Sequence, residues 1–317
     1  MKNLLLIGLP YHHYTDEIVK ELGKMGYRVS FHEIQPRTLY LKTLRVLSPA
    51  RYQRALDRHH AGIIEREQGR QFDVVLFIQV HQFSLANMER LKQLHTQSRF
   101  ILYNWDAVTT HDYRPYVGFF DKVFTFDPED ARRYGVHYLP LFCIAPFQNL
   151  EKRHQDQRAI YFVGNIVSVQ RYLALQEFKK YCASVGVTFN CFMACSLLVL
   201  TRLLRSGIVP SDVSLRSIPH HDFIAMIENS TAVFDFANHQ QSGFTMRTIE
   251  NLCAGKKLIT NNERITGEAF YSPDRILLIK DLDFAEVKQF MARALVLPDE
   301  TFPQFHIRSF LQTLVAA

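Results

Sequence analysis

The stretch Gly243–Asn262, with the apolar run TAVFDF before it, constrains the fold more than any other part of the chain. A polar loop, HQQS, follows the apolar run, and apolar residues then recur at helical spacing. These residues are Met246, Ile249, Leu252 and Cys253. Gly255 is placed to end that helix, and a second apolar run, Leu258–Thr260, follows. Strand, loop, helix, glycine and strand in this order predict a crossover between parallel strands.

The start of this predicted helix is also a candidate anion site. The N-terminus of a helix leaves backbone N–H groups unpaired and carries a partial positive charge. Ser242, Gly243, Thr245 and Arg247 all lie near it, and Glu250 follows one turn later, where it can accept hydrogen bonds from a sugar hydroxyl. A phosphate site with a carboxylate beside it suggests that a nucleotide sugar binds here. The alternative is an ordinary crossover helix with polar residues on its solvent side.

The beginning of the chain predicts a second βαβ unit. Asn3–Gly8 is an apolar run, Thr15 and Asp16 can cap a helix that ends near Gly26, and Tyr27–Phe31 is the next strand. The loop after the first strand has no GxGxxG pattern, which argues against a nicotinamide dinucleotide site.

Apolar runs and helical segments go on alternating along the chain. The expected strands are Asp73–Val80, Phe100–Tyr103, Lys122–Phe126, Val136–Leu139, Ala159–Val163, Val187–Cys191 and Arg275–Ile279. The expected helices start after Ser84 and after Asp127, span Ser168–Ser184, Leu197–Arg205, His220–Glu228 and Asp283–Leu295, and end with Phe302–Val315. A polar segment, Leu141–Arg158, interrupts the alternation and predicts a boundary between two α/β units.

The composition is that of a globular protein without a membrane span. The chain has 317 residues, 47% of them hydrophobic and 21% charged, with a net charge of +6, which suits phosphate-bearing ligands or an anionic membrane surface. Five cysteines without a CxxC pair indicate free thiols in a reducing compartment and no zinc site. The longest apolar run, Cys191–Leu200, is about half of a membrane span. We therefore expect a cytoplasmic protein, peripheral to the inner membrane at most.

The segment Arg37–Arg58 is strongly basic. Its six cations are Arg37, Lys42, Arg45, Arg51, Arg54 and Arg58, against one acid, Asp57, with leucines interleaved. Two amphipathic helices separated at Pro49 fit this pattern. They present either an ordinary solvated face or a surface that meets anionic lipid or a phosphorylated glycan acceptor.

Two α/β units with an anion site in the second match the GT-B glycosyltransferase architecture. The segment SGFTMRTIENLCAGKKLITNN resembles bacterial glycosyltransferase-like proteins of lipopolysaccharide and capsule biosynthesis. The shared elements of their Q-x-G-x-x-x-R-x-x-E-x-x-x-x-x-K-x-I-T pattern are Gln241, Gly243, Arg247, Glu250, Lys257, Ile259 and Thr260. The run Ile160–Arg171 also resembles the start of the second domain in that group and in spore-maturation-type relatives.

The resemblance implies a donor site in the second domain. Glu250 would bind the donor ribose, and Arg247 with the amides near Gly243 would hold the phosphates. Gly164 and Asn165 would line the donor cleft from the first loop of that domain. Two further residues qualify this picture. Arg171 would either contact phosphate or form a surface pair. Ser242 stands where many retaining relatives have a second glutamate, so the sequence leaves open whether the reaction retains or inverts the anomeric centre.

Catalytic groups are expected from the first domain. Asp106 follows a strand in the loop NWDAVTTHD, His81 ends the most buried strand, and His12 and His13 lie in the first loop. Each can supply the base that glycosyl transfer needs, or can be a structural cap or hydrogen-bond partner. The resemblance implies no metal, because GT-B enzymes hold the diphosphate with protein groups, and the DxD sequence at Asp281–Asp283 is expected to cap a helix.

The sequence therefore predicts an α/β protein of GT-B type with two Rossmann-like domains facing across a cleft. The expected ranges are 1–145 for the acceptor side, 146–300 for the nucleotide sugar and 301–317 for a helix that packs back on the first domain. The expected function is transfer of a sugar from a nucleotide sugar to a lipopolysaccharide, O-antigen or capsule intermediate. A nucleotide-sugar epimerase and a non-catalytic binding protein are the alternatives, and no nucleic-acid partner is expected.

Overall fold

The computed structural model describes residues 1–11, 13–148, 150, 159–236, 242–295 and 302–316. These residues form two compact units. Unit 1 comprises the described residues within 1–144, 240–244 and 303–317, and unit 2 those within 145–239 and 245–302. The chain leaves unit 1 after residue 144, and two later segments return to it.

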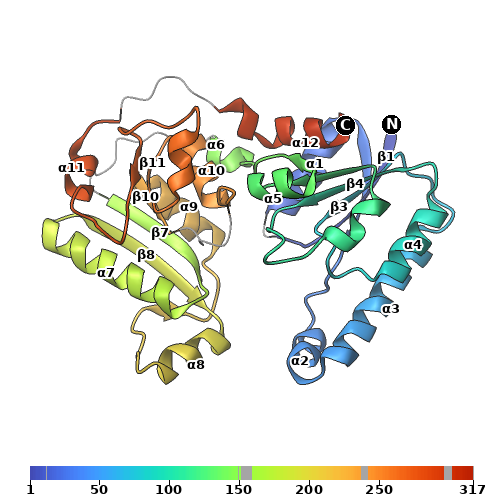
Figure 1. Ribbon diagram of the computed structural model, residues 1–317, viewed down its shortest axis with the longest axis horizontal. Helices are drawn as coiled ribbons and strands as arrows, with labels where there is room; N and C mark the ends of the chain where they lie inside the picture. Colours follow the sequence, from blue (N-terminus) through green and yellow to red (C-terminus); the bar gives the residue numbers. More distant parts are fainter. Residues whose placement is uncertain (12, 149, 151–158, 237–241, 296–301, 317) are drawn as a thin grey trace. The chain divides into compact units, whose positions relative to one another are not determined.

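Unit 1 is a parallel sheet with helices (Figure 1). Its described strands lie in the order β2-β1-β3-β4-β5-β6, and every pair of neighbours is parallel. The strands are β1 (Lys2–Gly8), β2 (Tyr27–Glu33), β3 (Val74–Ile78), β4 (Arg99–Asn104), β5 (Lys122–Thr125) and β6 (His137–Tyr138). The helices are α1 (Tyr14–Lys24), α2 (Leu39–Leu47), α3 (Pro49–Glu67), α4 (Leu85–Leu94), η1 (Arg114–Phe119), α5 (Pro128–Tyr134), η3 (Pro303–Phe305) and α12 (Ile307–Ala316).

Unit 2 has the same construction. Its strand order is β12-β11-β10-β7-β8-β9, again with parallel neighbours. The strands are β7 (Ala159–Ile166), β8 (Thr188–Cys195), β9 (Val213–Ser214), β10 (Ala232–Asp235), β11 (Lys257–Thr260) and β12 (Ile276–Leu278). The helices are α6 (Ala145–Gln148), α7 (Val169–Val185), α8 (Leu197–Arg205), α9 (His220–Glu228), α10 (Met246–Cys253), η2 (Glu263–Gly267) and α11 (Val287–Ala292).

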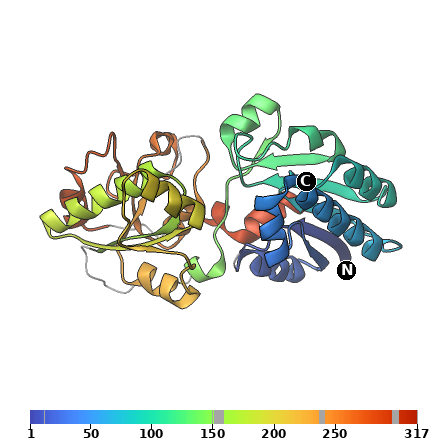
Figure 2. The same ribbon diagram turned by 90° about the horizontal axis from the view of Figure 1, so that it is seen from below.

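Each unit has its own apolar core between sheet and helices. In unit 1 the buried rings of Phe77, Phe83 and Phe100 belong to one cluster with residues of α3 and α4. In unit 2 Phe178 of α7 stacks on Phe234 of β10, with ring centroids 4.0 Å apart. α7 packs against β7 and β8 (Figures 1 and 2).

The C-terminal helix α12 belongs to unit 1. It packs against α1 and β4 (Figure 2). Phe310 contacts Tyr103 edge-on at 4.7 Å and stacks on Phe142 at 4.2 Å between ring centroids. Arg308 reaches Glu21 of α1 at 3.2 Å. The apolar face that the sequence predicts for this helix is therefore buried in unit 1.

Three local predictions were wrong. Gly164 and Asn165 lie inside β7, not in the loop after it, because β7 pairs with β8 along eight residues, up to Ile166 opposite Cys195. Thr15 is the second residue of α1 and does not cap it; its hydroxyl bonds the loop at Leu9 and Tyr11 instead. The helix expected over Asp283–Leu295 is the short α11, and Asp283 accepts a hydrogen bond from the N–H of Ala285 ahead of that helix.

Among the described residues, no helix has both the length and the apolar character to cross a membrane.

Candidate functional site

The chain reverses its direction across the unit 2 sheet between β7 and β10. From β7 it proceeds outward through β8 and β9, and then returns to add β10, β11 and β12 on the other side. In open parallel sheets, ligands bind at the carboxyl ends of the strands where the order reverses in this way. The residues that end β7 and β10, and those that start α10, meet at this point.

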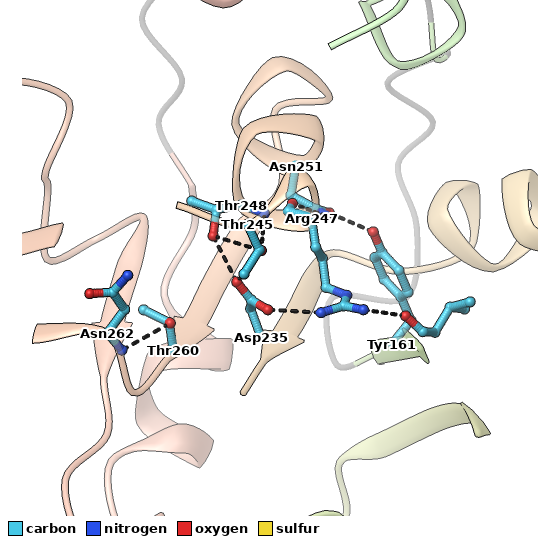
Figure 3. Close-up of polar contacts among 9 residues, drawn as sticks. Tyr161, Asp235, Thr245, Arg247, Thr248, Asn251, Thr260 and Asn262 are labelled. Carbon is cyan, nitrogen blue, oxygen red and sulfur yellow. Dashed lines mark hydrogen bonds and ion pairs between the residues drawn. The ribbon is translucent and has the colours of Figure 1, made fainter. Parts of the chain in front are cut away.

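Asp235, the last residue of β10, organises the polar contacts there (Figure 3). Its side chain is 1% exposed. One carboxylate oxygen accepts hydrogen bonds from the hydroxyls of Thr245 and Thr248, each at 2.7 Å, and the other accepts one from Arg247 at 2.8 Å. Thr245 also caps α10 by accepting the N–H of Thr248 at 3.1 Å. The carboxylate thereby fixes the first turn of α10 against β10.

Arg247 is held on three sides. Besides the Asp235 pair, its guanidinium donates to the backbone carbonyl of Val163 and lies over the Phe162 ring, 4.9 Å from the centroid. Burial alone would lower the pKa of Arg247, but the Asp235 carboxylate keeps it above the ordinary arginine value. Arg247 is therefore a fixed, charged group at the carboxyl end of β7.

Gly164 is required by this arrangement. A Cβ atom at this position would lie 2.7 Å from a guanidinium nitrogen of Arg247 and 3.0 Å from the Phe162 ring. Only glycine lets the arginine cross the strand here. In this structure Gly164 makes room for Arg247, and the donor-cleft role expected for Gly164 stays a prediction.

Arg171 is a second guanidinium beside the first. It lies on α7, 5.5 Å from the centroid of the same Phe162 ring. Its buried Nε has no hydrogen-bond partner, and no carboxylate pairs with Arg171 among the described residues. Burial and the nearby charge of Arg247 lower the pKa of Arg171 to about 10. The site therefore holds two guanidinium groups, of which Arg247 is paired with Asp235.

Glu250 and Asn251 extend the site along α10. Glu250 is 7% exposed, and its charge acts on Arg247 and on the buried Tyr161. Asn251 accepts the Tyr161 hydroxyl at 2.8 Å and donates to the Arg247 backbone carbonyl at 2.8 Å. The structure thus brings Gly164, Arg171, Thr245, Arg247 and Glu250 together in unit 2. Asn165 lies next to Gly164 in β7.

Ser242 and Gly243 belong to unit 1. The backbone N–H of Ser242 donates to the Asp127 carboxylate at 2.7 Å and that of Gly243 at 3.3 Å. Asp127 is 2% exposed and also caps α5. A Cβ at Gly243 would lie 2.5 Å from the Phe126 carbonyl oxygen, so only glycine fits. The anion that these amides bind in this structure is the protein's own carboxylate. Gln241, an element of the family pattern, lies outside the described residues.

Unit 1 has a second polar cluster at the carboxyl ends of β3 and β4. The Asp106 carboxylate accepts from the Gln79 side-chain amide and contacts His111 Nδ1 at 3.0 Å. The His111 ring stacks on His81, with centroids 3.7 Å apart. Burial, and then the neighbouring His111, lower the pKa of His81 to about 4, so its ring is neutral at physiological pH. Asp106 and His81 were predicted as site residues, and the structure places them together.

His111 and Gln79 are the members that the sequence analysis missed. His111 follows Asp106 by five residues in the same loop, and this short spacing could have indicated that the two side chains meet. Gln79 is 2% exposed and has φ 65°, a left-handed conformation that is rare for a residue with a side chain. Strain of this kind concentrates at functional sites. In this conformation the Gln79 side-chain amide donates a hydrogen bond to the Asp106 carboxylate.

The first loop of unit 1 contributes an aromatic group. Tyr11 packs against Trp105 with ring centroids 5.5 Å apart, and against Tyr14 at 5.9 Å. His13 is exposed and precedes α1 as its N-cap residue without a side-chain cap bond. His12 lies outside the described residues. The role expected for either histidine stays a prediction.

Comparison with known proteins identifies the fold. No protein-family model and no curated protein sequence matches the chain. Among solved structures, the catalytic domain of starch synthase IV from Arabidopsis thaliana matches with a TM-score of 0.61 at 7% identity, over 92% of each chain. The lipopolysaccharide outer core galactosyltransferase WaaB matches with a TM-score of 0.56 at 12% identity, over 99% of each chain. The chain has the GT-B fold.

The GT-B fold is shared by more than one activity. UDP-GlcNAc 2-epimerase from Neisseria meningitidis, in a complex with UDP-GlcNAc, matches with a TM-score of 0.56 at 11% identity, over 100% of this chain and 99% of the other. The prediction of two Rossmann-like parallel-sheet domains of GT-B type is confirmed. At these identities the likeness is one of fold.

Proposed function

We propose that this protein is a glycosyltransferase that moves a sugar from a nucleotide-sugar donor to a cell-surface glycan intermediate of the lipopolysaccharide, O-antigen or capsule type. The observation that carries the proposal is the unpaired Arg171 guanidinium beside Arg247, at the point where the unit 2 sheet reverses its order. Arg171 is half-buried and its Nε has no hydrogen-bond partner, and an anionic ligand would supply one.

The donor would bind with its diphosphate against Arg171 and Arg247. Asp235 is paired with Arg247, which leaves the Arg171 guanidinium as the group available to the diphosphate. Two structural neighbours support a nucleoside diphosphate as the ligand class, since starch synthase IV is bound to ADP and an alpha-glucosyltransferase is in complex with UDP. Glu250 then accepts hydrogen bonds from the ribose. Ser242 and Gly243 would join in only if their amides exchanged Asp127 for phosphate.

The chemistry would use the cluster in unit 1. In this proposal His111 takes the tautomer that donates from Nδ1 to Asp106, and its Nε2 acts as the base toward the acceptor hydroxyl. As the acceptor oxygen bonds to the anomeric carbon, the bond from that carbon to the diphosphate oxygen breaks. The proton passes to His111 Nε2, and the nucleoside diphosphate leaves with its charge stabilised by the arginines. Asp106 orients the ring and stabilises its cationic form.

A thermal-shift screen with UDP-, GDP-, dTDP- and CMP-sugars tests the proposal. We expect one nucleotide class to raise the melting temperature, and Arg171→Met and Glu250→Ala to reduce that rise strongly. The matched control is Arg264→Met, an exposed arginine of unit 2, which should leave the rise unchanged. The absence of a response to every nucleotide would count against a donor site.

An epimerase on the same fold is the second candidate, favoured by the likeness to UDP-GlcNAc 2-epimerase. The two activities separate by product analysis of the sugar nucleotide that gives the thermal shift. An epimerase changes the sugar without an acceptor, whereas a transferase releases nucleoside diphosphate in proportion to glycosylated acceptor. Binding without turnover in either assay would indicate a non-catalytic binding protein.

We further propose that the reaction needs no metal ion, since protein guanidinium groups can hold the diphosphate. Turnover should then persist in excess EDTA, whereas loss of turnover that added Mg²⁺ or Mn²⁺ restores would overturn this part of the proposal.

A further inference from the structure

Helix α2 exposes an apolar face to solvent. Leu39, Val46 and Leu47 are 80%, 79% and 76% exposed, and Tyr40 is exposed beside them. With Thr43 these positions follow the spacing i, i+1, i+4, i+7, i+8, which places them on one side of the helix. Only Leu41 of α2 is buried. Figure 1 shows α2 at the end of α3 that points away from the unit 1 sheet.

Helix α8 in unit 2 repeats this pattern. Leu197 and Leu198 are 67% and 61% exposed, and Leu204 is also exposed. With Thr201 and Arg205 they occupy the same five relative positions as the exposed face of α2. Val199 and Leu203 face inward. In Figure 1, α8 lies beyond the carboxyl end of β8. Within each unit, then, a nine-residue helix buries one apolar side and exposes another.

The charges around both faces have one sign. The exposed cations are Lys42, Arg45, Arg51, Arg54 and Arg58 near α2, and Arg202, Arg205 and Arg216 near α8. None of the eight pairs with a carboxylate among the residues that the structure describes. The two nearby acids have other partners: Asp57 accepts from Gln53, and Asp212 pairs with Lys179.

We propose that α2 and α8 each dock on an anionic lipid bilayer, with leucine and valine side chains among the acyl chains and the arginines and lysine at the headgroups. This inference concerns where the protein works and does not depend on the reaction proposed above. Nucleic acids and anionic glycans match the cations, but they offer nothing to the exposed leucines. A bilayer offers both, and Tyr40 suits its interface.

Vesicle co-sedimentation of the full-length protein, without nucleotide, tests this docking. We expect binding to vesicles of dioleoylphosphatidylcholine with about one third dioleoylphosphatidylglycerol, and weak binding to vesicles of dioleoylphosphatidylcholine alone. Val46→Gln/Leu47→Gln and Leu197→Gln/Leu198→Gln should each weaken the partition at least about tenfold. Glutamine keeps the charge constant and favours helix, so circular dichroism should show folded variants.

Matched controls remove exposed apolar side chains elsewhere. Leu85→Gln/Leu94→Gln in unit 1 and Val167→Gln/Leu173→Gln in unit 2 should bind as the parent protein does. Absence of binding to anionic vesicles would overturn the proposal. So would binding that neither helix variant changes, because charge alone would then explain it. If sedimentation velocity shows a self-associated protein that the helix variants make monomeric, the faces are an interface between copies. If only one of the two helix variants weakens binding to anionic vesicles, the other helix does not dock, and the proposal is overturned for that helix.

Discussion

At the scale of single residues, the unit 2 site is built from two carboxylates, Asp235 and Glu250, and two guanidiniums. Asp235 ends a strand, Arg247 lies on a helix and Arg171 on another, and the Phe162 ring lies near both arginines. The sequence pattern predicted Arg247, Glu250 and Arg171 as ligand contacts but not Asp235, because an aspartate at the end of an apolar run reads as an ordinary strand end. Its role depends on a contact between segments ten or more residues apart.

Removing the Asp235 carboxylate should destabilise the protein. Asp235→Ala leaves Arg247 buried without its partner, and we expect a loss of roughly 3–5 kcal/mol in the free energy of unfolding, measured by urea denaturation. The double variant Asp235→Ala/Arg247→Met removes both charges and should recover much of that loss. An equal loss in both variants would show that the pair itself contributes little.

Replacing the missed histidine should affect turnover more than binding. His111→Ala removes the base that Asp106 orients, and we expect turnover to fall by about 10²–10⁴-fold while the nucleotide thermal shift, which reports on unit 2, persists. The control is His221→Ala, whose side chain is 82% exposed in unit 2. Unchanged turnover in His111→Ala would assign the proton transfer to another group.

At the scale of elements, the sequence predicted most of the fold. The bounds of α8 and α9 agree with the prediction, as does the division of α2 from α3 at Pro49, because apolar spacing and proline act locally. The extra length of β7 and β8 was not predictable. Residues 164–166 and 192–195 extend because each strand completes the hydrogen bonds of the other, and that pairing joins distant segments. The same limit hid Gln79, since Gln79 and Asp106 meet only when β3 and β4 pair.

Helix α3 should make stability depend on pH. His60 of α3 is buried, bonds the Ile34 carbonyl through Nε2 at 2.7 Å, and stacks on Phe83; burial lowers its pKa to about 4. Between pH 6.5 and 4, the unfolded chain binds a proton at this position that the folded chain excludes. The free energy of unfolding should therefore fall as pH falls through this window, by on the order of 3 kcal/mol from His60.

The contribution of His60 can be isolated by substitution. His60→Gln keeps a side-chain donor without a titration, so its stability should depend less steeply on pH than that of the parent protein in urea denaturation between about pH 4.5 and 7. His221→Gln, at an exposed position, serves as the control. Parallel curves for His60→Gln and the parent protein would show that another group causes the dependence.

At the scale of the whole molecule, the two units have separate cores but share the chain in an interleaved order. Unit 1 takes its last helix from residues beyond unit 2, and Ser242 and Gly243, in the middle of the unit 2 sequence, bind Asp127 of unit 1. The sequence pattern indicated two α/β units and a final amphipathic helix, which was expected to pack back on the first domain. The sequence did not predict that residues 242–244 belong to unit 1, because a short loop contains no periodicity of apolar residues.

Damage to α12 should therefore destabilise unit 1 and spare the nucleotide response of unit 2. Phe310 is 1% exposed between Tyr103 and Phe142, and Phe310→Ala should cost about 3–5 kcal/mol of unfolding free energy, measured by denaturation. The thermal shift with nucleotide should remain. Thr313→Ala, at an exposed position of the same helix, is the control. Loss of the nucleotide response in folded Phe310→Ala would show that the units are not independent in binding.

The contacts of α12 also set an order of events during synthesis on the ribosome. The strands of unit 1 leave the ribosome first, but the side chain that fills the space between Tyr103 and Phe142 belongs to residue 310. All of unit 2 is translated before that residue appears. The first-made half of the protein is thus the last to be completed, and it must wait with an apolar surface uncovered. We expect nascent chains that end before α12 to be the species that chaperones bind most strongly.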